Sequence, residues 1–335
     1  MNHGRTAFQM FDRWVWSDRP LRLLAPADST SPAADSDVFV EWNDHTLEVP
    51  SGATTVMHSA WFTTHRLPQR YVFDVHFAGL RVDITEGGRH LRVHPLTADV
   101  SERLADPAAT LVTNVLSRLP SVWGEVPLHS ACLDVGHGLL LLCAMSGTGK
   151  STLSQHLTRA HGWPILDDDT SVVRVVGGDL QVVPMGARSR IRADAAADLG
   201  LVGEQLTGYA GGKQMLPRVA FDRERVARQS VAAVVHVLAV PAETEGVLPM
   251  STVQGATTSG LVSLVRSTTP IDPLAPGHRQ ELLRVGALMA ACPTWLLTYQ
   301  RGAVSASDIA AEISELVALL PSDQPVQTGP TREHS

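Results

Sequence analysis

Cysteine, aromatic residues and basic charge are all scarce in this sequence of 335 residues. Its three cysteines, Cys132, Cys143 and Cys292, have no metal-binding spacing, and they do not indicate a disulfide framework. Lys and Arg number 27 against 34 Asp and Glu, which gives a formal net charge of −7. An acidic balance of this kind argues against a nucleic-acid partner.

Long apolar runs are missing as well. No window reaches the ~18 consecutive apolar residues that a membrane-spanning helix needs. Residues 1–16 lack a basic region followed by an apolar core, so we expect no signal peptide. The hydrophobic fraction of 44% is that of an ordinary globular protein. We therefore expect a cytoplasmic protein with no membrane partner, and the composition leaves its oligomeric state open, a homo-oligomer included.

One motif stands out, because residues 144–151 read Ala-Met-Ser-Gly-Thr-Gly-Lys-Ser. This is a phosphate-binding loop in all but its first position, where Ala144 replaces the usual glycine. The apolar run at 138–143 predicts a buried strand before the loop, and the leucine spacing at 152–160 predicts a helix after it. Such a turn directs backbone N–H groups and a helix N-terminus at one point, where nucleotide phosphates bind.

We expect the nucleotide to be ATP accompanied by Mg²⁺. Lys150 is expected to bridge the β- and γ-phosphates, and the Ser151 hydroxyl to bind Mg²⁺. The full set of expected nucleotide-binding residues is Ser146, Gly147, Thr148, Gly149, Lys150, Ser151 and Thr152.

Three adjacent carboxylates, Asp167, Asp168 and Asp169, follow a short apolar segment sixteen to eighteen residues past Ser151. One helix and a turn fill this gap, so a second parallel strand is predicted to end at the carboxylates, where such sheets bind ligands. Adjacent carboxylates repel one another unless cations are near, and Mg²⁺ carried by a nucleotide is the obvious cation. The alternative is a solvated acidic turn.

His129 lies fifteen residues before Ala144, and a lone histidine is more often structural than catalytic. Taken together, however, His129, the loop at 146–151 and the Asp168–Asp169 pair resemble the kinase domain of the HPr kinase/phosphorylase family in order and spacing. The resemblance covers roughly residues 124–240, and more loosely 270–300. It extends to related stand-alone kinases, some of which phosphorylate precursor peptides in lasso-peptide biosynthesis.

The resemblance implies an α/β P-loop kinase core and roles for individual residues. Asp168 is the implied general base for the acceptor hydroxyl, and His129 is implied to lie near the acceptor. Asp169 is implied to lie close to Mg²⁺ with Ser151, and Asp167 is an extra carboxylate at that metal. Residues 273–279 match only partly the C-terminal stretch of the bifunctional members, so a reverse phosphorylase activity is not implied.

Basic residues mark a candidate acceptor region. Arg188, Arg190 and Arg192 alternate with other residues, and on a strand this spacing puts all three guanidiniums on one face. Such a stripe binds phosphate or an acidic peptide, or else is a solvated edge paired with local carboxylates. Lys213 follows two glycines, which predicts a mobile basic loop able to close over a γ-phosphate.

The function expected from these residues is an ATP-dependent kinase for a serine hydroxyl of a peptide or protein, with a ribosomally made, lasso-type precursor as one candidate. Three alternatives stay open: a small-molecule hydroxyl kinase, an HPr-type regulatory protein kinase, and a nucleotide-binding regulator without transfer activity.

Four parts are predicted along the chain. Residues 1–97 form a small β-rich unit, 98–122 a connecting helix ended by Pro120, 123–320 the P-loop kinase domain, and 321–335 a disordered tail. Composition predicts a flexible loop at 25–37. The individual predicted strands are 38–42, 71–77, 80–84, 91–94, 132–135, 171–176, 180–183, 231–240 and 294–299, and the predicted helices of the kinase domain are 194–199, 279–291 and 307–320, the last capped by Ser307.

Overall fold

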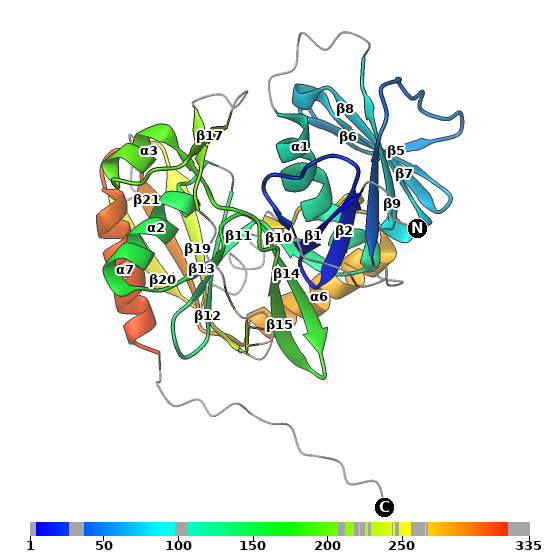
Figure 1. Cartoon of the computed structure of the whole chain (residues 1–335). Coiled ribbons are helices and arrows are strands. Elements are labelled where there is room, and N and C mark those ends of the chain that lie inside the picture. The colour runs from blue at the N-terminus through cyan, green and yellow to red at the C-terminus, as the bar shows by residue number, and fades with distance from the viewer. Residues whose placement is uncertain are drawn as a thin grey trace, which may run out of the picture.

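The computed structural model is a mixed α/β fold with several sheets (Figure 1). It describes residues 5–26, 37–97, 106–145, 147–206, 212–217, 221, 225–226, 229–242, 244, 248–255, 265 and 267–320. The predicted tail at 321–335 and most of the loop predicted at 25–37 lie outside the described residues. Among the described helices, none is both long enough and apolar enough to cross a bilayer.

A nine-stranded sheet occupies residues 6–95, in the order β3-β1-β2-β4-β9-β8-β7-β6-β5. Its strands are β1 (Thr6–Met10), β2 (Arg13–Ser17), β3 (Ala25–Pro26), β4 (Val38–Trp42), β5 (Thr54–His58), β6 (Phe62–Leu67), β7 (Arg70–Val75), β8 (Leu80–Thr85) and β9 (His90–Pro95). The four strands predicted in this region are confirmed as β4, β7, β8 and β9. The strands β5 to β9 form an antiparallel meander, and short 3₁₀ turns, η1 (His76–Ala78) and η2 (Glu86–Gly88), connect β7 to β8 and β8 to β9.

The connecting segment is helical, but it does not end at Pro120 as predicted. It comprises α1 (Pro107–Thr110), the π-helix η3 (Leu111–Val115) and the 3₁₀ helix η4 (Leu116–Trp123). The tighter 3₁₀ turn accommodates Pro120 within η4. Gly124 then ends the segment in the left-handed conformation, with φ of 82°.

The second large sheet has the order β13-β11-β12-β19-β21-β20. These strands are β11 (Ser130–Asp134), β12 (Leu139–Ala144), β13 (Ile165–Asp167), β19 (Val231–Val240), β20 (Met250–Gln254) and β21 (Thr294–Gln300). β12, β19 and β21 are parallel neighbours, whereas β11 is antiparallel to both β12 and β13. β13 therefore runs in the same direction as β12, one strand removed from it, and both end at the same edge of the sheet.

Apolar side chains cover both faces of this sheet, as the continuous apolar run at 231–240 predicts. One face packs against α2 (Lys150–His161) and α7 (Ala306–Ala318), and the other against α6 (Pro276–Met289). Helix α7 begins one residue earlier than predicted, and its cap is Ser305 rather than Ser307. The Ser305 hydroxyl accepts the Asp308 N–H while the Asp308 carboxylate accepts the Ser305 N–H, so this pair satisfies the free amides of the first turn.

Two smaller sheets complete the fold. The strands predicted at 171–176 and 180–183 are confirmed as β14 (Ser171–Val176) and β15 (Asp179–Pro184), which pair as an antiparallel hairpin, and β10 (Val126–Leu128) extends it. A three-stranded sheet consists of β16 (Arg190–Arg192), β18 (Lys213–Met215) and β17 (Glu204–Leu206), and α3 (Ala193–Asp198) follows β16.

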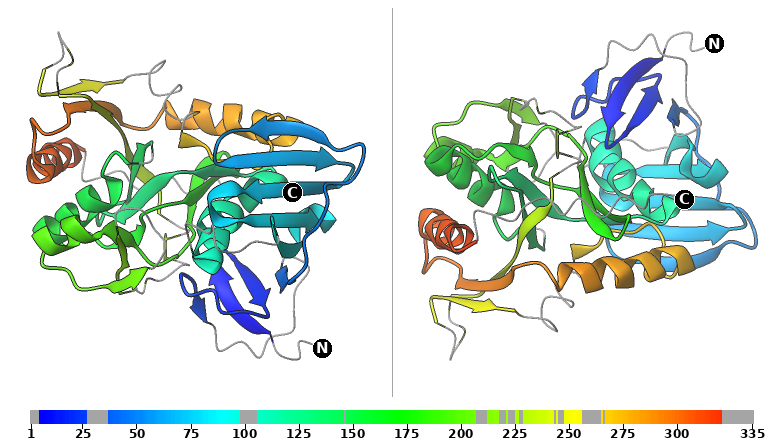
Figure 2. Two further views of the ribbon diagram at one scale, coloured as in Figure 1. Left: turned by 90° about the horizontal axis from the view of Figure 1, so that it is seen from above. Right: turned by 90° about the horizontal axis from the view of Figure 1, so that it is seen from below.

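The nine-stranded sheet and the rest of the chain share one apolar cluster. Val172, Val183, Met185, Met215 and Ile271 pack in the same cluster as the inner face of the nine-stranded sheet. Backbone bonds also cross between the two parts, from Phe11 N to Met185 O at 3.1 Å, for example. Figure 2 shows α6 alongside the nine-stranded sheet in both views. The two parts therefore share one hydrophobic core where they meet.

Candidate active site

The loop at 144–151 joins the end of β12 to the start of α2, as the sequence predicts. Gly147 and Gly149 have φ of 82° and 88°, a conformation that suits glycine, and Gly149 directly precedes the helix. Among the described residues, Phe11 and Gln69 are the non-glycine positions with positive φ, so Ala144 carries no such strain. Ser146 lies outside the described residues.

Side chains at the carboxyl end of β21 and within the loop hold the loop in place. The Tyr299 hydroxyl donates to the Thr148 carbonyl at 2.7 Å, and Arg301 Nη2 donates to the Gly147 carbonyl at 3.3 Å. The Thr148 hydroxyl donates to the Met145 carbonyl at 2.7 Å. The sequence analysis did not identify Tyr299 or Arg301 as site residues. The signal that could have found them is their position at the carboxyl end of the strand predicted at 294–299, because parallel sheets bind ligands at that edge.

Lys150 is buried beside the loop, with 5% of its surface exposed. Its Nζ donates to the Ala144 carbonyl at 2.9 Å. Burial lowers the pKa of Lys150 to about 8, against the opposing influence of Asp169, Cys143 and Asp168. A phosphate at this place would supply the negative charge that a buried ammonium lacks.

Asp167 has a structural role that the sequence analysis did not anticipate. Its Oδ1 accepts the N–H groups of Asp169 and Thr170 at 2.9 and 3.1 Å, and its Oδ2 accepts the N–H of Gly186 at 2.9 Å. Burial raises the pKa of Asp167 to about 7. Because backbone donors engage both oxygens, the carboxylate fixes the turn after β13, and this arrangement does not favour Asp167 as a metal ligand.

Asp168 lies beside the loop at 144–151, where Ser151 is near enough to lower its pKa slightly. The Asp168 Oδ2 accepts the Arg190 N–H at 3.2 Å. Burial, and then the neighbouring charge of Asp169, raise the pKa of Asp168 to about 6. A carboxyl group with a pKa near neutrality can take up and release a proton under ordinary conditions.

Asp169 lies in a cationic environment instead. Its Oδ2 is 2.9 Å from Arg190 Nη2, and its Oδ1 is 3.6 Å from His129 Nδ1. Burial alone raises the pKa of Asp169, but Arg190, His129, Lys150 and Lys213 outweigh it, so the net shift is downward. Asp169 is therefore the more acidic member of the pair.

His129 lies against the Asp169 backbone. Its Nδ1 donates to the Asp169 carbonyl at 2.9 Å, which leaves Nε2 as the acceptor nitrogen of a neutral ring. Burial and the nearby Lys150 lower the pKa of His129 to about 4. The structure thus brings together His129, Lys150, Ser151 and the Asp168–Asp169 pair, as their spacing suggested.

The three arginines do not form one stripe, contrary to the expectation. Strand β16 begins only at Arg190, so Arg188 lies outside the alternating segment. Arg188 instead donates to the Leu216 carbonyl at 3.0 Å and pairs with Glu204, while the exposed Arg192 pairs with Asp194 at 2.7 Å. Only Arg190 reaches the acidic pair.

Lys213 lies in strand β18 rather than in a mobile loop, because it pairs with Arg192 in the register of β16 and β18. Its charge nevertheless acts on the site. Burial and the charge of Arg190 lower the pKa of Lys213, while Asp169 and Asp168 raise it. Lys213 is therefore close enough to the acidic pair to contribute positive charge there.

Arg118, from η4, is a further cation that sequence reasoning missed. Its Cζ lies 4.7 Å from the Phe62 ring centroid and 5.9 Å from that of Phe73. Burial lowers the pKa of Arg118 to about 10, and the charge of Asp169 opposes this shift. The connecting segment thus supplies a positive charge to the Asp169 side of the site.

Comparisons with known proteins give only a weak structural similarity. No family model matches the sequence, and no curated protein is similar to it. Among solved structures, the Hpr(Ser) kinase/phosphatase from Coxiella burnetii is similar over 57% of this chain and 88% of its own, with 15% identity and a TM-score of 0.28.

Proposed function

We propose that this chain is an ATP-dependent kinase that transfers the γ-phosphate to a serine hydroxyl of a peptide or protein. One observation carries the proposal: the Asp168 carboxyl group, with its pKa near 6, lies beside Ser151 of the loop at 144–151. A candidate proton acceptor and a candidate phosphate cradle are therefore neighbours. Transfer of a phosphoryl group requires mainly positioning and charge neutralisation, which these groups supply.

Each side chain has a part in this proposal. The loop amides and Lys150 bind the phosphates, and Asp168 accepts the proton of the acceptor hydroxyl. Lys213, Arg190 and Arg118 surround the acidic pair with positive charge, which would stabilise the charge of the transferring phosphoryl group.

Mg²⁺ fits the donor set only together with the nucleotide. In the described part of the chain, no group of three or more His, Cys, Asp or Glu side chains is placed to hold a metal ion. Magnesium is commonly bound by one or two carboxylates together with substrate phosphates, so a complete protein cage is not required. Ser151 and Asp168 offer the neighbouring oxygen atoms, and such an ion would neutralise phosphate charge.

The same proximity supports a second role for Asp168 within this function. Because Asp168 lies beside Ser151, it is a candidate metal ligand as well as a candidate base. The two roles predict different effects of Mg²⁺ concentration on an Asp168 variant.

The decisive experiment is transfer of label from γ-labelled ATP to serine-containing peptides and to small hydroxy compounds. We expect acid-stable label on a peptide serine with the wild-type protein and none with Lys150→Ala. Label on small hydroxy compounds alone would favour a small-molecule kinase. Tight ATP binding without any transfer or hydrolysis would favour a regulator.

A further inference from the structure

Arg118 is a cation that the described part of the chain leaves without an ion pair. Its guanidinium donates no hydrogen bond to the described residues, and its Nε is a buried atom without a partner. The residue as a whole is half-buried, so part of it stays accessible. Arg190, by contrast, has its partner in Asp169 at 2.9 Å. Since a partly desolvated charge is costly without a counter-charge, this arrangement indicates that a ligand supplies one.

Two aromatic rings of the nine-stranded sheet hold the guanidinium in place. Arg118 lies over Phe62 and Phe73, whose own rings stack with their centroids 5.6 Å apart. A ring attracts a guanidinium through the face of the ring, whereas the N–H groups of the guanidinium lie in its own plane. The rings therefore fix the orientation of Arg118 and leave its N–H groups for another partner.

The position of Arg118 on η4 directs it towards the candidate active site. In a 3₁₀ helix, side chains three residues apart lie on the same side, so Arg118 and Ser121 share one side of η4. The Ser121 Oγ accepts the Ile271 N–H at 2.9 Å. Earlier on the same segment, the Ser267 carbonyl accepts the His129 N–H at 2.7 Å. This side of η4 therefore faces the chain segment that borders His129.

Within the site, Arg118 lies on the Asp169 side and away from the phosphate loop. The charge of Asp169 opposes the downward shift of the Arg118 pKa, and the charges of Lys150 and Asp168 do not contribute to that shift. Lys150 and Asp168 are the residues proposed to meet the nucleotide and its γ-phosphate. Because the acceptor oxygen attacks in line, opposite the leaving group, a cation beyond the acidic pair faces the acceptor rather than the nucleotide.

The charge at this place selects the class of ligand group. Asp169 already has Arg190 as its ion-pair partner, with further cations around it, so it does not neutralise Arg118 as well. A guanidinium presents parallel N–H groups that match the two oxygens of a carboxylate, and each of the two groups carries a single charge. A carboxylate of the acceptor therefore fits Arg118.

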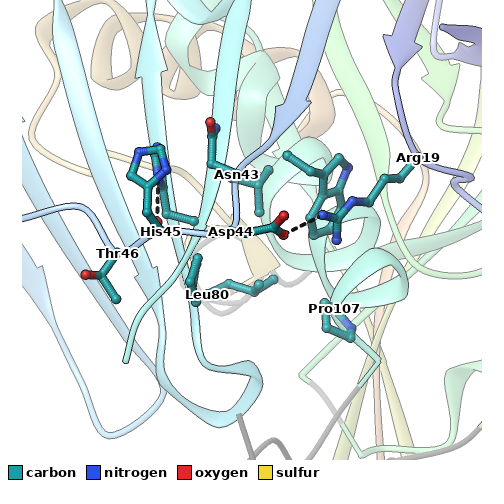
Figure 3. Close-up of a pocket in the computed structure, with 11 residues that line it drawn as sticks. Arg19, Asn43, Asp44, His45, Thr46, Leu80 and Pro107 are labelled. Carbon is teal, nitrogen blue, oxygen red and sulfur yellow. Dashed lines mark hydrogen bonds and ion pairs between the residues drawn. The ribbon is translucent and has the colours of Figure 1, made fainter. Parts of the chain in front are cut away.

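An arginine beside a cavity elsewhere in the fold shows the contrast. A cavity of about 570 Å³ lies at the end of β4, and Figure 3 shows Arg19 there with its guanidinium directed at Asp44. Arg19 Nη2 is 2.8 Å from Asp44 Oδ1, so this arginine already has its counter-charge and gives no site for an anion. For Arg118, the described residues supply no such carboxylate within ion-pair distance.

We infer that Arg118 binds a carboxylate of the acceptor, beside the serine hydroxyl that receives the phosphoryl group. The inference rests on the proposed function and defines its substrate class, because it makes the acceptor an acidic peptide or protein segment. The carboxylate belongs to an acidic residue next to the serine, or to a chain terminus at the serine. Both sources present the same group to Arg118, and separate peptides distinguish them.

The first measurement compares matched serine peptides as acceptors for the wild-type protein with Mg-ATP. Acetyl-Glu-Ser-Glu amide and acetyl-Gln-Ser-Gln amide differ only in the flanking carboxylates, and acetyl-Ala-Ser with a free terminus differs from its amide only in the terminal one. We expect kcat/KM to be at least about tenfold higher for the charged member of one pair, because a charge-assisted contact is gained. A preference in the first pair identifies a side-chain carboxylate, and one in the second identifies the terminus.

Variants connect this preference to Arg118. Arg118→Gln removes the positive charge, and we expect the ratio of kcat/KM within the preferred pair to fall to about one, whatever the absolute rate of the variant. Arg284→Gln breaks an exposed pair with Glu281 on α6 and should keep the wild-type ratio. Arg118→Lys keeps the charge but loses the paired N–H groups, so it should lower the ratio at least about threefold and serves if Arg118→Gln fails to fold.

A binding measurement does not depend on phosphoryl transfer. The Arg118 Nε–H resonance of ¹⁵N-labelled full-length protein, identified by its loss in Arg118→Lys, is followed in the wild type with a non-hydrolysable ATP analogue present. We expect the charged peptide of the preferred pair to shift this resonance saturably, and its uncharged counterpart to bind at least about tenfold more weakly.

The outcomes separate this inference from the kinase proposal. Equal kcat/KM within both pairs overturns the inference while transfer itself supports the kinase, and so does a preference that Arg118→Gln leaves intact. Absence of transfer to every peptide contradicts the kinase proposal, and the Arg118 resonance then decides the inference. A saturable shift that requires the carboxylate supports the carboxylate site, and absence of such a shift overturns it.

Discussion

Replacement of Asp168 by Asn tests the proposed base directly. Asn keeps the size of the side chain and an oxygen that can accept the Arg190 N–H, but it cannot take up the acceptor's proton at neutral pH. We expect Asp168→Asn to bind Mg-ATP nearly as the wild type does and to lose about 10²–10⁴-fold in the rate of the chemical step.

The burial of Asp168 also predicts how the wild-type rate depends on pH, because burial raises the pKa of this carboxyl group. With a pKa of about 6, Asp168 is roughly nine-tenths ionised at pH 7 and roughly one-tenth at pH 5. The protonated acid is inactive as a base, so the rate should fall about tenfold per unit as pH falls below about 6. A solvated aspartate would place this limb about two units lower.

Hydrolysis of ATP by water provides an assay that does not require the acceptor. Single-turnover rates are measured from pH 4.5 to 8 with saturating Mg-ATP, and affinity for a fluorescent ATP analogue is measured separately. The matched control is Asp179→Asn, since Asp179 is an exposed carboxylate at the tip of the β14–β15 hairpin. We expect the control to retain the wild-type rate and the acid limb.

Two results would refute the base assignment. One is an Asp168→Asn rate above about a tenth of wild type, and the other is an acid limb that persists unchanged in the variant. A third result distinguishes the metal role: if excess Mg²⁺ restores the rate of Asp168→Asn, then Asp168 serves chiefly as a metal ligand.

Three further changes probe the surrounding residues. Lys150→Ala should weaken Mg-ATP binding about ten- to a hundredfold in titration calorimetry, because a charge-assisted contact is lost; unchanged affinity would contradict the phosphate site. Arg190→Ser should lower turnover at least about tenfold by removing the partner of Asp169, whereas Arg192→Ser breaks an exposed pair and should change turnover little; equal effects would count against the Arg190 role. Tyr299→Phe should cost about 1 kcal/mol of stability by thermal melting, with a smaller stabilisation by ATP, since the phosphate loop loses its anchor at Thr148; a melting curve identical to wild type would exclude this anchor.

Local patterns predicted much of the second sheet and of the loop. The apolar run at 231–240 became β19 with the same bounds, because a strand buried on both faces needs apolar residues throughout. The glycines and Lys150 likewise marked the turn between β12 and α2. These features depend on residues close in sequence, so a pattern of a few residues suffices to predict them.

Features that depend on tertiary contacts were not predictable in this way. Alternation suggested equal roles for Arg188, Arg190 and Arg192, but β16 begins only where Ile191 can pack inward. The backbone bonds to Asp167 come from Asp169, Thr170 and Gly186, and the last of these is nineteen residues away. A sequence pattern does not specify which of three adjacent carboxylates a distant loop engages.

The acidic pair shows how the whole fold acts on one site. Asp168 and Asp169 are neighbours in sequence, yet burial raises the pKa of the first, while surrounding cations lower that of the second. Carboxylates driven apart in this way can take different chemical roles. One of the charges near Asp169 belongs to Arg118, which reaches it from η4 with its guanidinium over Phe62 of the nine-stranded sheet. Since an electrostatic interaction acts on both partners, Arg118 also favours the ionised form of Asp169, and its contact with Phe62 links the nine-stranded sheet to the site as the shared core does.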